Sequence, residues 1–411
     1  MTGRTVVIGG GAAGIAAART LHDAGAEVLL IEAADRLGGR ARSVRLPTGH
    51  VVDHGCGWLH SARRNPWTAI AEQAGFTVDR RAPNWDAQWQ DLGFPPDQQA
   101  AADDAFEQFE TAALAACRGP DRPLSDFVAT DDPWRPMIDA ISGYVNGAAL
   151  VDVSLHDWAA YEEAASEDNW AVVEGYGTVI ADHARGVPIR TGVTATLIDH
   201  RGRTIRIATS HGTIEADRVV IAVPTTVLAE GRLRFDPPLP AKQDAAAALP
   251  LGLADKVFLS VEGPLPWPAH AHLTGNPHSA CTASHRLSPF GWPIVESFFG
   301  GPCAEALEED GAAAAFAIDE LVALLGSDWR RRFTPLDATR WRGVPLIGGS
   351  YSHARIGHAD ARQALARPVE DRLFFAGEAC SREDFSTAHG AFTTGAEVAR
   401  TIFDPEVHRT A

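Results

Sequence analysis

The sequence predicts an α/β plus α+β fold with two domains, in which a Rossmann-like domain is joined to a domain of mixed sheets and helices. Three observations support this prediction. The chain has 411 residues, enough for two domains and a large core. It begins with a strand, a glycine-rich turn, a helix and a second strand, the order of a βαβ unit. Further strands and helices follow over the rest of the chain.

The glycine-rich turn has the spacing of a dinucleotide-binding loop. Gly9 permits a tight turn, Gly11 lets the backbone approach a pyrophosphate, and Gly14 lets the following helix pack against the strand. The first turn of that helix, which includes Ala13, offers N–H donors and positive partial charge to the pyrophosphate. The sequence therefore predicts that a dinucleotide binds here.

An acidic residue ends the second strand, which spans residues 27–31. Glu32 stands where a carboxylate binds the hydroxyl pair of a ribose, and we assign the adjacent Ala33 to the same cofactor site. A carboxylate repels a 2′-phosphate, which argues against NADP. This pattern alone does not separate NAD from FAD.

The end of the chain repeats the arrangement of its start. A buried strand at residues 373–376 breaks at Gly377-Glu378, and a helix over residues 389–402 follows a loop. The N-termini of the two helices require two electron-rich targets. FAD offers both, since it has a pyrophosphate and the pyrimidine edge of a flavin. A plain NAD domain followed by an arginine- and glycine-rich loop remains the alternative.

The segments between these ends predict further elements. A helix near residues 66–74 precedes a stretch from about 79 to 170 that is rich in helix, for example at residues 103–116. Strands are predicted at residues 189–197, 204–208, 213–215, 218–223, 256–261 and 294–299, and a helix at about 312–325.

Composition and charge exclude several classes of function. The formal net charge of −17 argues against a nucleic-acid partner and is compatible with a cationic substrate. No apolar stretch approaches the length of a membrane span, and we expect no signal peptide because the predicted first strand begins near residue 4. The five cysteines are scattered, so we expect neither a disulfide framework nor a metal site, and the expected location is the cytoplasm.

Taken together, the motifs resemble those of the flavin-dependent amine oxidases, which include monoamine oxidases, polyamine oxidases, histone lysine demethylases and L-amino acid oxidases. The motif Arg-x-Gly-Gly-Arg at residues 36–40 resembles their FAD signature, and polyamine oxidases are the closest in motif. The family's landmarks follow in order along nearly the whole chain: Gly9–Gly14, Arg36–Arg40, Gly55, Trp58, His60, Val193, Val219–Pro224, Asp255-Lys256, Trp341, Gly348–Ser352, Phe375–Glu378 and His389–Ala391.

The resemblance implies how the chain is divided and which residues hold FAD. The FAD-binding domain would be assembled from residues 1–78, 171–248 and 346–404, and the substrate domain from residues 79–170 and 249–345. Val193 would contact the adenine and Glu378 the ribityl or pyrophosphate region. The other residues that the resemblance assigns to FAD are Gly38, Gly39, Arg40, Gly57, Trp58, Gly377, Thr387 and Ala388.

Lys256 is the sharpest catalytic candidate. The chain has 36 lysines and arginines, but only Lys242 and Lys256 are lysine. Burial in an apolar strand disfavours an ammonium and lowers its pKa, so a lysine there is able to exchange protons where an arginine is not. In the family, the matching lysine holds a water against flavin N5 and influences reoxidation by oxygen. A strand-edge lysine that reaches solvent is the alternative.

Two aromatic residues are candidates for contacts with the substrate. By resemblance, Tyr351 would form one wall of an aromatic cage that directs an amine to the flavin. Thr387 stands where monoamine oxidases have the opposite wall, so half of the cage is missing. Trp341 would offer an aromatic face that attracts amines instead. Ser350 replaces the cysteine that binds flavin covalently in monoamine oxidases, so we expect noncovalent FAD.

His60 matches a histidine of animal and fungal polyamine oxidases. It would accept a hydrogen bond from a substrate amine or assist proton removal. A loop histidine with a structural role is the alternative. Glu162 and Glu163 are able to face a distal ammonium, although acids on a solvated surface are commoner, and we assign them no role.

The sequence thus predicts an FAD enzyme that oxidises a small-molecule amine, with a polyamine or secondary amine favoured, and with oxygen or another acceptor reoxidising the flavin. One alternative is an enzyme of the same fold that acts on carbon–carbon bonds, such as a desaturase or a protoporphyrinogen-oxidase-like enzyme. Less favoured are an L-amino acid oxidase and a flavin-bearing binding module without turnover.

Overall fold

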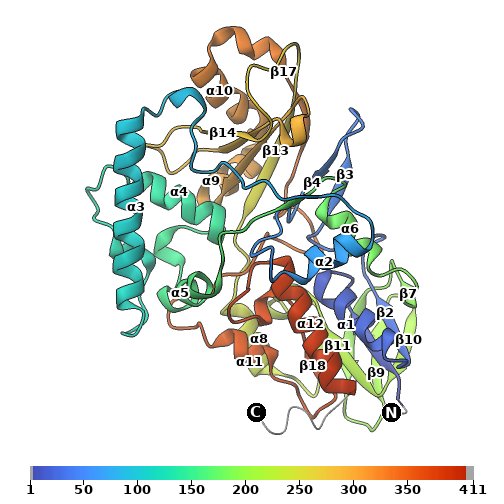
Figure 1. Cartoon of the computed structure of the whole chain (residues 1–411). Coiled ribbons are helices and arrows are strands. Elements are labelled where there is room, and N and C mark those ends of the chain that lie inside the picture. The colour runs from blue at the N-terminus through green and yellow to red at the C-terminus, as the bar shows by residue number, and fades with distance from the viewer. Residues whose placement is uncertain (1–2, 404–411) are drawn as a thin grey trace.

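The computed structural model describes residues 3–403. A five-stranded parallel sheet forms the lower part of the molecule in Figure 1, with the strand order β18-β11-β1-β2-β7. These strands are β1 (Thr5–Ile8), β2 (Val28–Ile31), β7 (Ile189–Arg190), β11 (Arg218–Ile221) and β18 (Leu373–Phe375). Residues 1–2 and 404, which the predicted FAD-binding domain includes, lie outside the described residues. The sheet confirms the predicted Rossmann-like half.

Both faces of this sheet are buried. Val7, Leu30 and Val220 face one cluster, which contains α1 (Ala12–Asp23) and α12 (Ala388–Phe403). Their neighbours in sequence, such as Ile8 and Leu29, face a second cluster on the other side. Since successive side chains of a strand alternate between faces, burial of both faces requires the continuous apolar runs seen in the sequence.

A four-stranded sheet with the order β10-β9-β8-β12 covers the second face. The predicted strand at residues 189–197 is wrong in its extent, because it is two strands in two different sheets. Gly192, with φ of +71°, turns the chain between β7 and β8. The strands and neighbouring helices are β8 (Ala195–Asp199), β9 (Ile205–Thr209), β10 (Gly212–Ala216), β12 (Arg234–Asp236), α7 (Thr225–Ala229), α8 (Pro240–Ala247) and α11 (Ala361–Ala366).

The upper half of Figure 1 contains a five-stranded antiparallel sheet with the order β14-β15-β16-β13-β17. One face packs on two helices through a core that includes Val257, Leu259 and Leu321. The other face turns toward the centre of the molecule. The elements are β13 (Ala254–Val261), β14 (Ala271–Thr274), β15 (Ser284–Leu287), β16 (Ile294–Gly300), β17 (Phe333–Ala338), α9 (Gly301–Asp310) and α10 (Ala313–Leu325).

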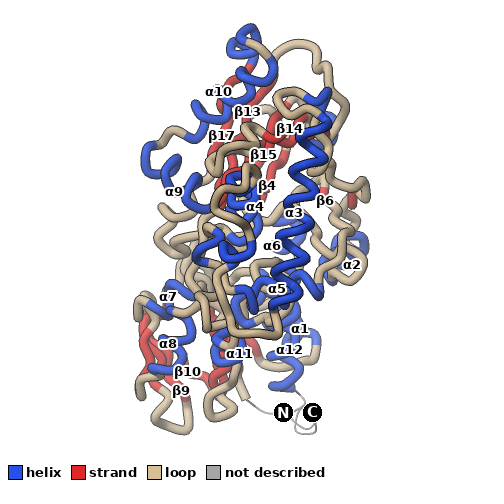
Figure 2. Tube along the Cα trace, turned by 90° about the vertical axis from the view of Figure 1, so that its left-hand side faces the viewer, coloured by secondary structure: helices blue, strands red, loops and turns tan. Residues whose placement is uncertain are grey.

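The stretch predicted to be helical supplies three helices, two of which stand beside the antiparallel sheet in Figure 2 while the third lies below it. Its chain leaves through β5 (Val78–Asp79) and returns through β6 (Ala171–Val172), which pair with each other. The helices are α3 (Pro96–Ala116), α4 (Arg135–Asn146) and α5 (Leu155–Ala164). Short elements complete the fold: β3 (Ser43–Arg45), β4 (Val51–Asp53), α2 (Pro66–Gln73) and α6 (Tyr176–Asp182). No helix within residues 3–403 combines the length and apolarity needed to cross a bilayer.

One expectation about the cysteines is wrong. Cys281, in the turn between β14 and β15, is disulfide-bonded to Cys303 in the first turn of α9. Cys56, Cys117 and Cys380 are free thiols. The pair was hidden because only the packing of α9 beside the sheet brings these two positions together. Among the described residues no group of three possible ligands is arranged to hold a metal ion.

Candidate active site

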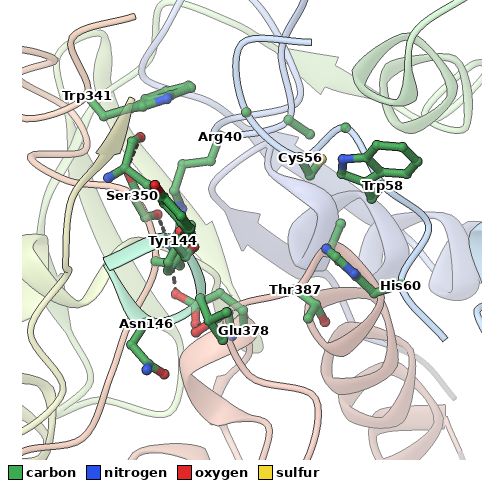
Figure 3. Close-up of a pocket in the computed structure, with 18 of the residues that line it drawn as sticks. Arg40, Cys56, Trp58, His60, Tyr144, Asn146, Trp341, Ser350, Glu378 and Thr387 are labelled. Carbon is green, nitrogen blue, oxygen red and sulfur yellow. Dashed lines mark hydrogen bonds and ion pairs between the residues drawn. The ribbon is translucent and has the colours of Figure 1, made fainter. Parts of the chain in front are cut away.

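One cavity of about 1060 Å³ extends from the glycine-rich turn to the antiparallel sheet and the inserted helices. This volume lies at the upper end of the range for ligand sites, and it suits a dinucleotide together with a substrate. All the predicted site residues except Gly14 line it. Figure 3 shows Trp58 and His60 on one side, across from Arg40, Ser350 and Glu378.

The glycine-rich turn fits the predicted pyrophosphate. Gly9 has φ of +107°, and a Cβ there would lie 2.3 Å from the carbonyl oxygen of Ala222. A Cβ on Gly14 would lie 1.9 Å from the oxygen of Gly9, so Gly14 is a packing position below the turn. At Gly11 a Cβ would meet only the oxygen of Gly38, at 3.9 Å, so it would project into open space. The backbone at Gly11 is therefore open to a ligand, at the N-terminus of α1.

Glu32 is anchored beside this turn. Its Oε2 accepts a hydrogen bond from the N–H of Gly10 at 2.5 Å, and its Oε1 accepts one from Ala34 at 2.7 Å. The N–H of Val193 donates to the backbone oxygen of Glu32 at 2.8 Å. Each carboxylate oxygen retains lone pairs, so the side chain is held in place while it remains able to accept from ribose hydroxyls.

Arg40 links a segment near the start of the chain to two segments near its end. Its Nη1 donates to the carbonyl oxygen of Ser350 at 2.7 Å and to Oε1 of Glu378 at 2.8 Å (Figure 3). The hydroxyl of Ser352 donates to the other carboxylate oxygen of Glu378 at 2.6 Å. Burial alone raises the pKa of Glu378, but Arg40 and Arg362 outweigh it and hold the pKa below its usual value. Two of the three cofactor-binding segments predicted from the sequence, residues 1–78 and 346–404, meet at this ion pair.

A second helix N-terminus faces the same cavity. Thr387 precedes α12, and its hydroxyl accepts from the N–H of Gly390 at 3.0 Å while it donates to the carbonyl oxygen of Asp384 at 2.7 Å. Thr387 is therefore a helix cap whose hydroxyl is already used. Thr387, Ala388 and Gly377 all line the cavity. The two helix N-termini expected from the sequence thus open into one space.

Alternate residues of the antiparallel sheet line the cavity wall. They include Lys256 on β13 and Glu296 on β16. Lys256 Nζ lies 2.8 Å from a carboxylate oxygen of Glu296 and donates to the carbonyl oxygen of Asp53 at 3.0 Å. The structure confirms that Lys256 is buried. The expectation of an amine with only apolar neighbours is wrong, because Lys256 forms a buried ion pair with Glu296. Glu296 was missed because its contact depends on strand register.

Two aromatic candidates are fixed by their polar atoms. The hydroxyl of Tyr351 donates to the carbonyl oxygen of Tyr144 on α4. The indole N–H of Trp341 donates to the carbonyl oxygen of His54 at 3.2 Å, and its backbone N–H donates to Asp255 at 3.2 Å. Both rings line the cavity, and Trp341 is buried. Their aromatic faces, rather than their polar atoms, are left for a ligand.

His60 is a neutral hydrogen-bond acceptor. Burial lowers its pKa to about 4, so the ring is uncharged at neutral pH. Nδ1 lies 2.7 Å from Oδ1 of Asn169, whose amide nitrogen donates to the carbonyl oxygen of Glu167. Since Oδ1 accepts, Nδ1 carries the proton and Nε2 keeps its lone pair. That lone pair is suited to an amine N–H.

The inserted stretch adds an acidic wall to which the sequence analysis assigned no role. Glu162 lines the cavity, whereas the adjacent Glu163 is exposed. Burial, reinforced by the nearby Glu110, raises the pKa of Glu162 to about 7. The acidic residues that residues 79–170 contribute to the cavity are Asp86, Asp103, Glu110, Glu162 and Glu167, and the same stretch contributes no lysine or arginine to it.

Comparison with known proteins decides the family. The model of the flavin-containing amine oxidoreductases matches residues 12–160 and 124–403 in two overlapping stretches. This chain belongs to that family. This chain is 30% identical to polyamine oxidase 2 of Arabidopsis thaliana, over 95% of its own length and 86% of that protein. It is 30% identical to polyamine oxidase 3 of Oryza sativa, over 96% of this chain and 88% of that protein.

Two further comparisons show partial coverage of one relative and a similar fold at low sequence identity in another. A rice protein, lysine-specific histone demethylase 1 homolog 1, is 30% identical over 97% of this chain, but only 52% of that protein is covered. The fold is similar to that of a redesigned double mutant of a putrescine oxidase, with a TM-score of 0.78, 19% sequence identity, and coverage of 98% and 99% of the two chains. The predicted family, two-domain fold, enzymatic class and flavin cofactor are thus confirmed.

Proposed function

We propose that this amine oxidoreductase oxidises a polyamine or a secondary amine and that oxygen accepts the electrons. The main support for a polyamine substrate is the acidic wall of the cavity. Within residues 3–403, none of its five carboxylates forms a salt bridge with a lysine or arginine. Glu110 and Glu162 are partly buried, whereas the other three are exposed. Such a wall suits the distal ammonium groups of a polycation, because carboxylates without cationic partners attract a cation.

The residues of the chain divide the work between binding and orientation. The first turns of α1 and α12, Glu32 and Arg40 would hold FAD, noncovalently because Ser350 replaces a cysteine. When bound, FAD would supply the hydride acceptor, and oxygen would then take two electrons and two protons to give hydrogen peroxide. The substrate loses hydride from the α-carbon, and water hydrolyses the resulting imine to a carbonyl compound and a smaller amine.

Three side chains would orient the reacting amine. His60 Nε2 would accept a hydrogen bond from the substrate nitrogen, and the faces of Tyr351 and Trp341 would direct it. By resemblance, Lys256 would hold a water molecule beside the flavin and assist reaction with oxygen. The alternative with a carbon–carbon substrate is less well supported, because it has no use for unpaired carboxylates in the cavity. An amino-acid substrate needs a free cation for its carboxylate, whereas Arg286 is occupied by His270 and Glu296.

A peroxide assay tests the proposal. Purified holoenzyme would be supplied with spermidine, N-acetylspermine, short monoamines and amino acids in air-saturated buffer. We expect hydrogen peroxide with the polyamines, at higher kcat/KM than with monoamines or amino acids. Absence of peroxide with every amine, together with an oxidised flavin, would favour the desaturase or the non-catalytic reading and overturn this proposal.

A further inference from the structure

Three charged side chains form a line on the cavity face of the antiparallel sheet. β16 lies between β13 and β15, and Arg286 is directly opposite Glu296 in their register. Lys256 is opposite Phe298, so it is the diagonal neighbour of Glu296 on the same face. Glu296 lies 2.8 Å from Lys256 Nζ and 3.6 Å from Nη1 of Arg286.

The two cations share one carboxylate within the cavity wall. All three side chains line the cavity, and the guanidinium of Arg286 lies 4.4 Å from the centre of the Trp58 ring. Burial alone raises the pKa of Glu296, but Lys256 and Arg286 outweigh it and hold the pKa low. The line of residues therefore keeps a net charge of +1 when it is fully ionised.

The other titratable groups around this line do not cancel that charge inside the cavity. Asp53 is directed away, since its carboxylate accepts from the hydroxyl of Ser43 and the N–H groups of Tyr176 and Gly177. Asp79 pairs with Arg81 at 2.6 Å and lies 3.1 Å from His270. Asp86 also lies near the sheet, on the segment whose Asn84 donates to the carbonyl oxygen of His270, but it is exposed, so solvent screens its charge. His54, His60 and His270 are uncharged at neutral pH because burial lowers their pKa, and burial raises the pKa of the Cys56 thiol.

The helical side of the cavity has the opposite charge. Glu110 on α3 and Glu162 on α5 belong to the acidic wall described above, which contains no lysine or arginine. One cavity thus has a positive side on the sheet and a negative side on the helices. Nearby cations disfavour protonation of an amine, whereas nearby carboxylates favour it.

We propose that Lys256 and Arg286, sharing Glu296, keep the reacting nitrogen of the bound amine unprotonated while the acidic wall holds a distal nitrogen as ammonium. This inference rests on the proposed function, because oxidation requires the lone pair of the reacting nitrogen. Arg286 and Glu296 are positioning residues that act through the charge they place in the cavity. The polarity of the cavity then determines which nitrogen of a polyamine lies at the sheet.

Variants that change the charge in opposite directions test this inference. Arg286→Gln removes a positive charge and Glu296→Gln removes a negative charge, while Arg286→Lys keeps the charge and is the matched control. The rate of anaerobic flavin reduction by saturating spermidine would be measured against pH. We expect the acidic limb to move to higher pH in Arg286→Gln and to lower pH in Glu296→Gln, each by on the order of one pH unit. The limb of Arg286→Lys stays at the wild-type position.

Proton release on binding supplies a readout that needs no turnover. The probe is an α,ω-diamine in which each nitrogen-bearing carbon carries two methyl groups and no hydrogen, so that it cannot be oxidised. Calorimetric titration of the holoenzyme near pH 8, in buffers of different ionisation enthalpy, gives the number of protons released. We expect about one proton per diamine for the wild type and fewer for Arg286→Gln.

The outcomes separate this inference from the proposed function. If the wild type oxidises spermidine but releases no proton on binding the diamine, or if both charge variants move the acidic limb in the same direction, the inference is overturned and the proposed function stands. If no amine reduces the flavin of the wild type, the proposed function itself is wrong.

Discussion

The two lysines of this chain occupy two regions that treat an ammonium in different ways. Both are buried, with exposures of 6% for Lys242 and 7% for Lys256. Lys242 on α8 donates to the carbonyl oxygens of Ala364, Leu365 and Arg367 at the end of α11, and its Nζ lies 4.4 Å from the centre of the Phe375 ring. Lys256 has one carbonyl and one shared carboxylate, and it lines the cavity.

This difference teaches how to separate a structural cation from a functional one. All three donors of Lys242 are used by the end of a helix, so that side chain stabilises the junction of α8 and α11. The partners of Lys256 leave its ammonium at the surface of a ligand cavity. Burial alone therefore does not distinguish the two, whereas the partners and the adjacent space do.

The largest expected effect is on catalysis at Lys256. Lys256→Met removes the cation beside the proposed flavin site, and we expect the rate constant for reoxidation by oxygen to fall by about 10²-fold. Stopped-flow mixing of reduced enzyme with oxygen measures it. An unchanged rate constant would remove the basis for assigning Lys256 to the oxygen reaction and would favour the reading in which the enzyme is not an oxidase.

The matched variant at the other lysine is expected to change stability instead. Lys242→Met leaves three carbonyl groups at the end of α11 without their donor, which costs about 1–3 kcal/mol. Urea unfolding of the holoprotein measures this change, and turnover per bound flavin is expected to equal that of the wild type. A loss of turnover with unchanged stability would contradict the assignment of Lys242 to a structural role.

A smaller effect is expected at the acidic wall. At pH 8, above the pKa of about 7 that burial gives Glu162, its side chain is a carboxylate. Glu162→Gln removes one charge-assisted contact, so we expect the KM for spermidine to rise about tenfold and the KM for a short monoamine to stay unchanged. Between pH 8 and pH 6 the KM of the wild type should rise toward that of Glu162→Gln, because protonation of Glu162 removes the same charge.

The exposed neighbour is the control for that prediction. Glu163→Gln makes the same chemical change one residue away, outside the cavity. Its KM values and their pH dependence should match those of the wild type. Equal effects of the two variants would mean that the overall negative charge of the protein, rather than a carboxylate in the cavity, attracts the substrate.

Local sequence was enough to predict one half of the site. The roles of Gly9, Gly11 and Gly14 follow from spacing, because a backbone turn and a close approach depend on neighbouring residues only. Burial of Lys256 and its place on a strand were predicted correctly for the same reason. Assignment of the other residues expected to hold FAD depended on resemblance, and the structure brings them to one cavity.

The other half depends on contacts between distant segments. Glu296 and Arg286 meet Lys256 because of the register of three strands, which no local pattern specifies. The bond between Cys281 and Cys303 depends on the packing of α9 beside the sheet. Glu162 and Glu163 look alike in sequence, and only the orientation of α5 separates a cavity residue from a surface residue.

The most direct test of the central claim is anaerobic mixing of the FAD-loaded enzyme with spermidine. If the cavity binds a polyamine and positions it for loss of hydride, the visible absorbance of the oxidised flavin disappears, and one equivalent of amine is consumed per flavin. If the flavin stays oxidised with spermidine and with every other amine, although each binds, the account of this protein as an amine oxidase is contradicted.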